Sequence, residues 1–384
     1  MINISDPKDC CGCTACASIC EHNAIKMQPD ALGFLYPIVD SNKCVDCGLC
    51  ERVCSFNDYY DRSLNLLQPK CYGARHKDMG EVETSRSGAA FIAISDWVLE
   101  QGGSVYGAGY TDHFRVVHKR ATTKEQRDEF KGSKYVQSDL AGVFRQIKVE
   151  LKEGKRVLFT GTPCQTSGLN SYIGKKLREN LLLVDIACHG VPGPYLWRDY
   201  IVYLEKIQGD EIVYVNFRDK QQFGWSYHKE TFTFKSTYKK IWFNKVFYQD
   251  IMFRYSCSSC HFCNVTRPSD ITIADFWGWE KTNIEINRDD KGLSLIMVNT
   301  EKGKYIFENV KKNLITFSAK IEDCLQPNFK HPTPIHSRRT QFEQDYVRYG
   351  FKYVFEKDYN SINIVSRCIN WIRQSLKLSA KKIF

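Results

Sequence analysis

Eight cysteines near the start of the chain repeat one spacing twice. In each run, three cysteines are separated from one another by two residues, and a fourth follows after three more. The runs are Cys10, Cys13, Cys16 and Cys20, and then Cys44, Cys47, Cys50 and Cys54. This spacing wraps a loop around a 4Fe–4S cluster, and the fourth cysteine of each run binds the other cluster. We therefore predict one cluster on Cys10, Cys13, Cys16 and Cys54, and another on Cys44, Cys47, Cys50 and Cys20.

A zinc site is the main alternative for these cysteines. Zinc is usually held by Cys-x2-Cys couples with four ligands for each metal, and two runs of three plus one do not suit that pattern. Proline usually follows the fourth cysteine, but Glu21 and Ser55 stand there in this chain. Proline is not a ligand, so the replacement affects packing and the reduction potential rather than cluster binding. Cys11 lies outside the spacing, and we interpret it as a bystander. The runs predict one-electron relays that perform no bond chemistry of their own.

A second group of cysteines lies much later in the chain. Cys257, Cys260 and Cys263 form a triplet without a fourth cysteine nearby, and zinc or no metal at all is an alternative for it. Cys164 and Cys188 each follow an apolar run that is typical of a buried parallel strand. Ligands bind beyond the carboxyl ends of such strands, so either cysteine could complete a third cluster. A buried cysteine can equally be a small apolar filler.

Two polar turns that contain glycine are candidates for binding a phosphate group. Residues 85–88 (SRSG) precede a predicted helix, whose N-terminus favours an anion, and residues 131–135 (KGSKY) form the second turn. An ordinary helix cap or turn is the simpler interpretation of each. His189 is a candidate proton relay, although a core histidine is the simpler interpretation, and we expect Trp277 and Trp279 to serve packing.

The elements that must position these residues predict an α/β or α+β fold. Apolar runs at 157–160 and 181–186 predict buried parallel strands. Further strands are expected at 104–110, 212–217, 231–234 and 271–274, with a helix inside 84–99. We divide the chain into a two-cluster ferredoxin-like domain of the bacterial type (1–58), a linker (59–70), a cofactor-binding domain (71–330) and a basic, aromatic, helical tail (331–384).

The end of the tail has an amphipathic pattern. Residues 363–384 combine apolar side chains with five lysines and arginines, which predicts a helix. We interpret it as a helix docked on its own domain. A helix that lies on a membrane surface is the alternative.

The composition fits a globular protein with more than one domain. Of 384 residues, 43% are hydrophobic and 26% charged, which excludes wholesale disorder. Without a long apolar run or an apolar N-terminal segment, we expect a cytoplasmic protein, peripheral at the inner membrane face if the tail binds lipid. In a reducing compartment, 17 cysteines indicate metal ligands rather than disulfides. Three clusters at roughly −2 each would lower the net charge of +10 to about +4, and no nucleic-acid-binding motif occurs, so we expect no nucleic acid partner.

Seven segments, in order along the chain, resemble the coenzyme F420 hydrogenase/dehydrogenase beta-subunit family. They are SRSGA (85–89), KGSKYVQS (131–138), VLFTGTPCQ (157–165), DIACHGVP (185–192), FRDK with GW (217–225), SCSSCHFC (256–263) and DITIADFWG (270–278). The resemblance covers about residues 71–330, and a preceding ferredoxin domain is a common arrangement in the family. It implies an iron–sulfur flavoprotein with FAD that oxidises or reduces coenzyme F420; similar proteins reduce a vinyl group of a chlorophyll precursor.

The resemblance also implies roles for individual residues. The flavin loops would map onto Ser85, Ser87, Gly88, Ser133, Lys134, Tyr135, Thr160, Gly161, Thr162 and Pro163. The third cluster would map onto the Cys257 triplet and one more cysteine, for which we favour Cys164 over Cys188. Ala89 stands where the family often has a second glycine, a departure from the pattern of the first loop. Similar two-part proteins occur in bacterial gene sets for surface polysaccharides, which implies a role in that biosynthesis.

We expect an oxidoreductase in which a flavin joins two-electron hydride chemistry to one-electron clusters. Electrons would pass between a hydride-type donor or acceptor, such as coenzyme F420 or another small molecule, and a carrier such as ferredoxin or a redox partner subunit. The alternative is a non-catalytic relay or docking subunit of a larger redox complex. A zinc-stabilised interaction protein is a third hypothesis, and the cysteine spacing argues against it.

Overall fold

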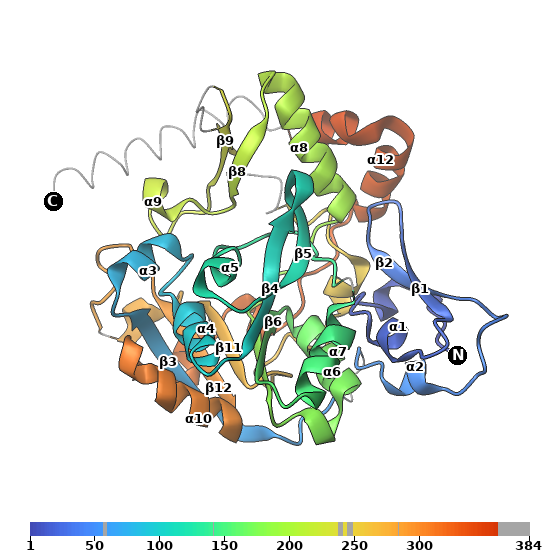
Figure 1. Cartoon of the computed structure of the whole chain (residues 1–384). Helices are drawn as coiled ribbons and strands as arrows, with labels where there is room; N and C mark the ends of the chain where they lie inside the picture. The colour runs from blue at the N-terminus through green and yellow to red at the C-terminus, as the bar shows by residue number, and fades with distance from the viewer. Residues whose placement is uncertain (57–59, 141, 237–240, 244–248, 283, 360–384) are drawn as a thin grey trace.

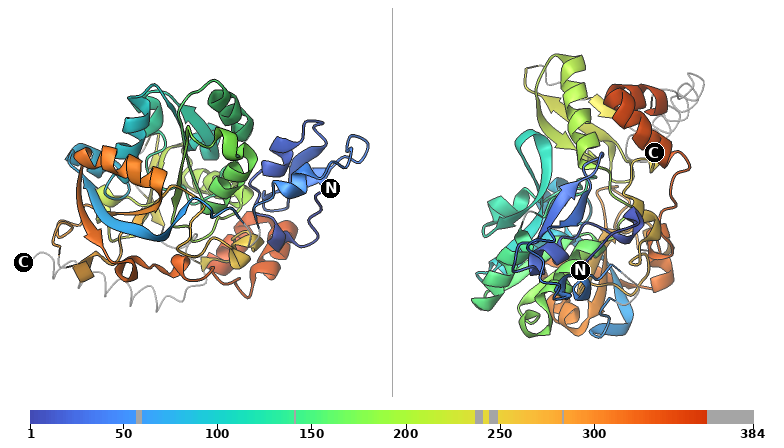
Figure 2. Two further views of the ribbon diagram at one scale, coloured as in Figure 1. Left: turned by 90° about the horizontal axis from the view of Figure 1, so that it is seen from below. Right: turned by 90° about the vertical axis from the view of Figure 1, so that its right-hand side faces the viewer.

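The computed structural model describes residues 1–56, 60–140, 142–236, 241–243, 249–282 and 284–359. A small module that contains α1, α2, β1 and β2 lies at one end of a larger mixed α/β domain (Figures 1 and 2). The α-helices are α1 (Ala15–Ile19), α2 (Leu49–Arg52), α3 (Met79–Thr84), α4 (Ala90–Leu99), α5 (Lys124–Asp128), α6 (Val143–Lys152), α7 (Pro163–Ile173), α8 (Pro194–Gln208), α9 (Lys220–Phe223), α10 (Glu301–Val310), α11 (Ile321–Cys324) and α12 (Arg339–Val354). The strands are β1 (Ile25–Pro29), β2 (Leu35–Val39), β3 (Asn65–His76), β4 (Ser104–Thr111), β5 (Arg115–Ala121), β6 (Val157–Gly161), β7 (Leu181–Ile186), β8 (Ile212–Asn216), β9 (Glu230–Phe234), β10 (Ile241–Phe243), β11 (Ile271–Asp275), β12 (Ser294–Thr300) and β13 (Leu314–Ala319).

The small module repeats its backbone conformation as well as its cysteines. Left-handed backbone occurs at Gly12 and Thr14, and again about 34 residues later at Asp46 and Gly48, with φ between +50° and +71°. These residues flank the second cysteine of each run. The same turn therefore carries each set of three thiols, and β1 and β2 pair antiparallel between the two turns.

The larger domain is built on an eight-stranded sheet in the order β13-β3-β12-β11-β7-β6-β4-β5. Within it, β11, β7, β6 and β4 run parallel, and the strands outside this group pair antiparallel with their neighbours. The carboxyl ends of the four parallel strands therefore meet at one edge of the sheet. In folds of this kind ligands bind at that edge.

Helices cover both faces of the sheet. Leu158 and Leu182 pack in a core with α4 and α10, whereas Phe159 and Leu183 pack on the opposite face with α6 and α7. Because both faces are covered, β6 and β7 are apolar almost throughout. Their predicted pairing as buried parallel strands is confirmed.

A separate three-stranded sheet, in the order β10-β9-β8, packs with α8 and α12 (Figure 1). Tyr200 of α8 contacts the ring of Phe232 in β9 at 5.7 Å and that of Phe351 in α12 at 6.1 Å. This aromatic core joins the start of the predicted tail to the larger domain.

The remaining sequence predictions agree with the structure only in part. Strands were expected at β4, β8, β9 and β11, but β3, β5, β12 and β13 were not. β3 begins at Asn65, inside the expected linker 59–70, because Leu66 packs against the core beneath α4 and α10. The tail contains α12, whereas the amphipathic pattern at 363–384 lies outside the described residues.

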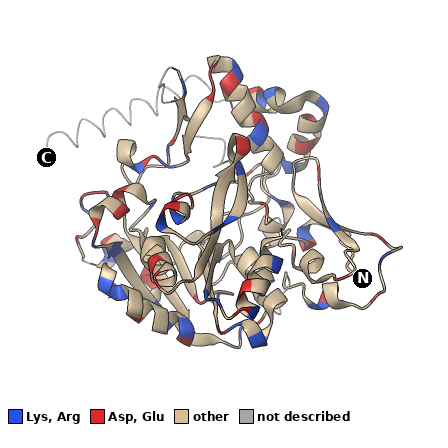
Figure 3. Cartoon of the chain, viewed as in Figure 1, with Lys and Arg blue, Asp and Glu red and all other residues tan. Residues whose placement is uncertain are grey.

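Charged side chains of both signs are mixed over the described chain. Figure 3 shows Lys and Arg interspersed with Asp and Glu on the same helices and loops. Among the described residues, no helix combines the length and the apolar character needed to cross a bilayer.

Candidate iron–sulfur centres and cofactor edge

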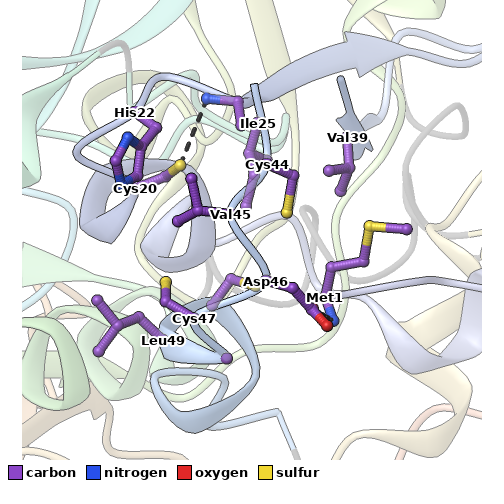
Figure 4. A pocket seen from close by; sticks show the side chains of 13 residues that line it. Met1, Cys20, His22, Ile25, Val39, Cys44, Val45, Asp46, Cys47 and Leu49 are labelled. Carbon is purple, nitrogen blue, oxygen red and sulfur yellow. Dashed lines mark hydrogen bonds and ion pairs between the residues drawn. The ribbon is translucent and has the colours of Figure 1, made fainter. Parts of the chain in front are cut away.

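The second set of cysteines surrounds a hollow at the surface of the small module. This space of about 380 Å³, partly open to solvent, is lined by all four cysteines predicted for one cluster: Cys20, Cys44, Cys47 and Cys50 (Figure 4). The backbone N–H groups of Ala24 and Ile2 donate to the sulfurs of Cys20 and Cys50, each at 3.3 Å. Hydrogen bonds to cysteine sulfur are one of the means by which proteins tune cluster potentials. The sulfurs, the space and the donors fit a 4Fe–4S cluster.

The first set lies deeper, between the small module and the larger domain. Burial is the main cause that raises the pKa of the Cys16 thiol, and repulsion from Cys13, Cys10 and Cys54 adds to it. Burial also raises the pKa of the Cys54 thiol to about 11. Cys54 thus joins the first run in space, although it ends the second run in sequence. The backbone N–H of Gly12 donates to Cys10 Sγ at 3.4 Å.

Within the described residues, no three His, Cys, Asp or Glu side chains converge as closely as a single metal ion requires. A cubane differs from a single ion in this respect, because its irons each take one cysteine and the ligands stand further apart.

The Cys257 triplet lies beside Cys188. Burial raises the pKa of the Cys188 thiol well above its ordinary value, and repulsion from Cys257, Cys164 and Cys260 adds to it. A hydrogen bond with Cys260 raises the pKa of the Cys263 thiol, and repulsion from Cys188 contributes. Cys188 therefore interacts with each thiol of the triplet.

Cys164 faces the small module as well as the triplet. A hydrogen bond with the Cys11 thiol is the largest cause that lowers the pKa of the Cys164 thiol, to about 7. Cys11 is buried and contacts Cys13 too, so the residue interpreted as a bystander lies at the junction of two cysteine sets. Thr162 Oγ1 is 3.2 Å from Cys164 Sγ.

The small module is held against the larger domain by close packing and by arginines. A Cβ on Gly168 of α7 would lie 2.7 Å from Cys13 Sγ, so only glycine allows this approach without a shift. Arg145 donates to the carbonyl oxygens of Ala17, Ser18 and Cys20 at 2.9–3.0 Å. The module therefore has a fixed position on the domain.

Two of the predicted flavin turns meet at the carboxyl-terminal edge of the parallel strands. His118 Nε2 is 2.9 Å from the Thr160 carbonyl oxygen, and His118 Nδ1 is 2.8 Å from Ser138 Oγ. The Gln165 side chain donates to Ser138 Oγ at 3.0 Å and accepts from the Thr162 backbone N–H at 3.0 Å. His118 thus ties the KGSKYVQS segment to the TGTPCQ turn. The sequence offered no signal for His118, because it lies on β5, outside every motif.

The start of KGSKYVQS lies beside α3, the helix that ends directly before the SRSGA turn, since Lys131 pairs with Glu81 at 2.7 Å and donates to Thr84 Oγ1 at 3.2 Å. A Cβ on Gly88 would lie 2.3 Å from the carbonyl oxygen of Ala74, so the glycine lets the start of α4 approach β3. Ala89 has φ +61°, a left-handed conformation that favours glycine. This strain explains why glycine would suit the position.

Ser85 and Arg86 carry buried donors without a partner in the part of the chain that the structure describes. There, Ser85 Oγ and Arg86 Nε and Nη1 form no hydrogen bond, whereas Arg86 Nη2 donates to the Trp225 carbonyl oxygen at 2.7 Å. Unpartnered buried donors are costly and uncommon. An anionic group bound here would satisfy them, so these two residues fit the phosphate part of a flavin cofactor.

Other residues expected at the flavin already have partners within the protein. Lys134 Nζ donates to the carbonyl oxygens of Lys131, in its own turn, and of Glu129, at the end of α5, each at 2.9 Å. Ser87 Oγ donates to the Leu293 carbonyl oxygen at 2.7 Å. Tyr135 packs edge-on against Phe217. The last expected residues have structural positions: Gly161 ends β6, Thr162 caps α7 and Pro163 begins it, while Ser133 is half-buried in the second turn.

A paired aromatic and ionic cluster lies at the carboxyl end of β11. The rings of Trp225 and Trp277 stack at 4.2 Å, and Trp225 Nε1 donates to Asp275 Oδ1 at 2.8 Å. Arg218 pairs with Asp275 and lies 3.0 Å from His228 Nε2. Two motifs far apart in sequence therefore form one wall beside Arg86, and Trp277 packs as expected.

His189 lies on the same edge, directly after Cys188. Its Nε2 pairs with Asp250 Oδ1 at 2.8 Å, and this hydrogen bond raises the pKa of the imidazole. With 41% of its side chain exposed, it is not the core histidine that was the simpler interpretation.

Two family models match the chain. Residues 154–323 match the carboxyl-terminal part of the beta subunit of coenzyme F420 hydrogenase/dehydrogenase, and residues 9–57 match "4Fe-4S dicluster domain". The SRSGA and KGSKYVQS segments lie between the two matched ranges. No curated protein matches the sequence. A chain of the F420-reducing [NiFe] hydrogenase complex from Methanosarcina barkeri is 17% identical, with a TM-score of 0.47 over 77% of this chain and 94% of that one. The chain thus combines a segment that matches a 4Fe-4S dicluster domain with a later one, residues 154–323, that matches the carboxyl-terminal part of the beta subunits of coenzyme F420 hydrogenases and dehydrogenases.

Proposed function

We propose that the chain is an iron–sulfur oxidoreductase subunit that exchanges electrons between a hydride-type small molecule and a one-electron carrier. The small molecule, of the coenzyme F420 type named by the matched family, would bind at the carboxyl-terminal edge of the large sheet. The carrier, a ferredoxin or a partner subunit, would dock at the small module. FAD would supply the conversion between hydride and single-electron chemistry.

The observation that carries this proposal is the junction of the cysteine sets. Cys11 and Cys13 of the small module lie against Cys164, which in turn interacts with Cys188 and Cys257. Cys47, in the set at the other side of the module, is exposed. The three sets therefore form a series from the sheet edge to the surface, as electron transfer through a protein requires.

Residues at the edge of the large sheet are candidates for holding the flavin and the third cluster. Ser85 and Arg86 offer the unpartnered donors for the anionic part of a flavin. For the third cluster we propose Cys188 as the fourth ligand in place of Cys164, because Cys188 interacts with all of the triplet. His189, which pairs with Asp250, would hold a proton beside this third cluster.

Anoxic purification and reconstitution, with iron, sulfide and flavin measured on one sample, tests the proposal. We expect about twelve irons and one flavin per chain, and bleaching of the flavin by a hydride donor such as reduced coenzyme F420. Cys260→Ala should lose about four irons, whereas Cys71→Ala, a buried cysteine outside all three sets, should lose none. About eight irons without flavin would favour the non-catalytic relay instead, and a colourless zinc protein would exclude both.

A further inference from the structure

One arginine of the larger domain reaches into the first cysteine set. Arg254 is 2% exposed, and its Nε donates to the Cys10 carbonyl oxygen at 2.8 Å. Its Nη2 donates to the Leu35 carbonyl oxygen at 2.9 Å and lies 3.7 Å from Cys10 Sγ, while Nη1 donates to Gln137 at 3.0 Å. The guanidinium also lies over the ring of Tyr36, at 4.2 Å. The positive charge is therefore held without solvent and without a carboxylate among these contacts.

The same residue begins the loop that carries the triplet. The backbone N–H of Cys257 donates to the Arg254 carbonyl oxygen at 3.0 Å. Burial raises the pKa of both the Cys10 and the Cys257 thiols, and the charge of Arg254 opposes it at both. Arg254 thus lies between the first cysteine set and the triplet.

A buried positive charge beside a cluster affects its reduction. Reduction adds one negative charge, and net charge and hydrogen bonds to sulfur are among the factors that set a cluster's potential. Buried charges are little screened, so Arg254 acts on the first set more strongly than a surface arginine would. Arg288 is such a surface residue, since 72% of its side chain is exposed and it pairs with Glu285 three residues earlier.

We propose that Arg254 is a positioning residue for electron transfer between the two domains, which fixes the Cys10 set against the larger domain and raises the reduction potential of its cluster. An electron crossing the junction is thereby stabilised on the Cys10 set. This inference rests on the proposed function, because it requires a cluster on that set. It goes beyond that function by assigning the control of the potential to one residue outside the ligands.

Potentiometric titration of the reconstituted full-length protein, followed by electron paramagnetic resonance, tests the inference. In Arg254→Gln we expect one cluster signal to move to more negative potential, with at least a tenfold change in its reduced-to-oxidised ratio, or about 59 mV for one electron. Arg254→Lys keeps the charge and should restore most of the shift. Arg288→Gln, the matched control on the surface of the larger domain, should leave every signal in place.

Iron content separates the possible failures. Unchanged signals in Arg254→Gln at full iron content overturn the inference and leave the proposed function intact. Equal loss of iron in the Gln and Lys variants shows a purely structural role and also overturns it. If Arg254→Gln does not fold, the reduction potential of Arg254→Lys decides. The Lys variant keeps the positive charge, so a tenfold or larger change in the reduced-to-oxidised ratio of its cluster contradicts a role of charge. Wild-type protein without clusters refutes the proposed function itself.

Discussion

Acidification should destabilise the protein through His118, the residue that ties two of the predicted flavin turns together. Burial lowers the pKa of His118 from 6.5 to about 4, so the folded protein keeps this imidazole neutral. The unfolded chain binds a proton in the intervening pH range and the folded chain does not, so stability falls as the pH drops below 6.5. The full effect is about 3 kcal/mol below pH 4, and about 1.4 kcal/mol is lost by pH 5.5.

His118→Gln removes the titration and keeps a polar side chain at the position. Between pH 7.5 and 5.5, the unfolding free energy of the wild type should fall by about 1.4 kcal/mol more than that of the variant, or roughly 2 °C in Tm. Anoxic thermal unfolding followed by tryptophan fluorescence measures this difference. Iron content measured at both pH values controls for loss of clusters.

The test compares how steeply the unfolding free energies of the two proteins change with pH, not the unfolding free energies themselves. The variant also loses the stacking of His118 on Phe159, which lowers its stability at every pH. Burial lowers the pKa of His228 to about 4 as well. His228 is present in both proteins, so its contribution to the pH dependence cancels when the two profiles are compared. Parallel pH profiles for wild type and variant would refute the reasoning.

Three further predictions test the site. Cys188→Ser should lose about four irons per chain and Cys164→Ser should keep them, as iron analysis will show; the reverse result would return the fourth ligand to Cys164. Gly168→Ala places a methyl group against a cysteine of the first set and should cost about 1–3 kcal/mol of unfolding free energy, with Ser171→Ala in the same helix as the control. Arg86→Leu removes two donors that have no partner among the described residues, together with one hydrogen bond to the Trp225 carbonyl oxygen. Arg218 also donates to that carbonyl, at 3.3 Å, so Tm should change little while flavin content falls at least tenfold; retained flavin would place the anionic group elsewhere.

Much of the candidate site follows from local sequence, because its ligands lie in short runs. The spacing of Cys10 to Cys20, repeated at Cys44 to Cys54, produces two turns with the same left-handed residues. The runs that form β6 and β7 were recognised because strands covered on both faces are apolar throughout. Such signals span fewer than about a dozen residues, within which spacing and periodicity decide the conformation.

Other elements could not be predicted because their conformation depends on distant neighbours. The first half of β3 lies in the predicted linker (59–70), yet the strand pairs with β12 and β13, more than 200 residues later. β12 has every residue buried, but a short apolar run of this kind does not distinguish a strand from a helix. The predicted flavin turns were recognised by motif. Only the contacts of the folded chain show that Lys134 donates to the carbonyl oxygens of Glu129 and Lys131, whereas Arg86 Nε and Nη1 have no hydrogen-bond partner among the described residues.

The sequence by itself determined that this chain carries two ferredoxin-like cysteine runs, a later triplet and an α/β domain. The tertiary structure decided how these parts meet: Cys188 beside the triplet, Cys11 against Cys164, and Arg254 on Cys10, across 244 residues of chain. Spacing within a run is a covalent property and can be read directly. Which buried charge lies next to which sulfur depends on the packing of two domains, and no local pattern encodes it.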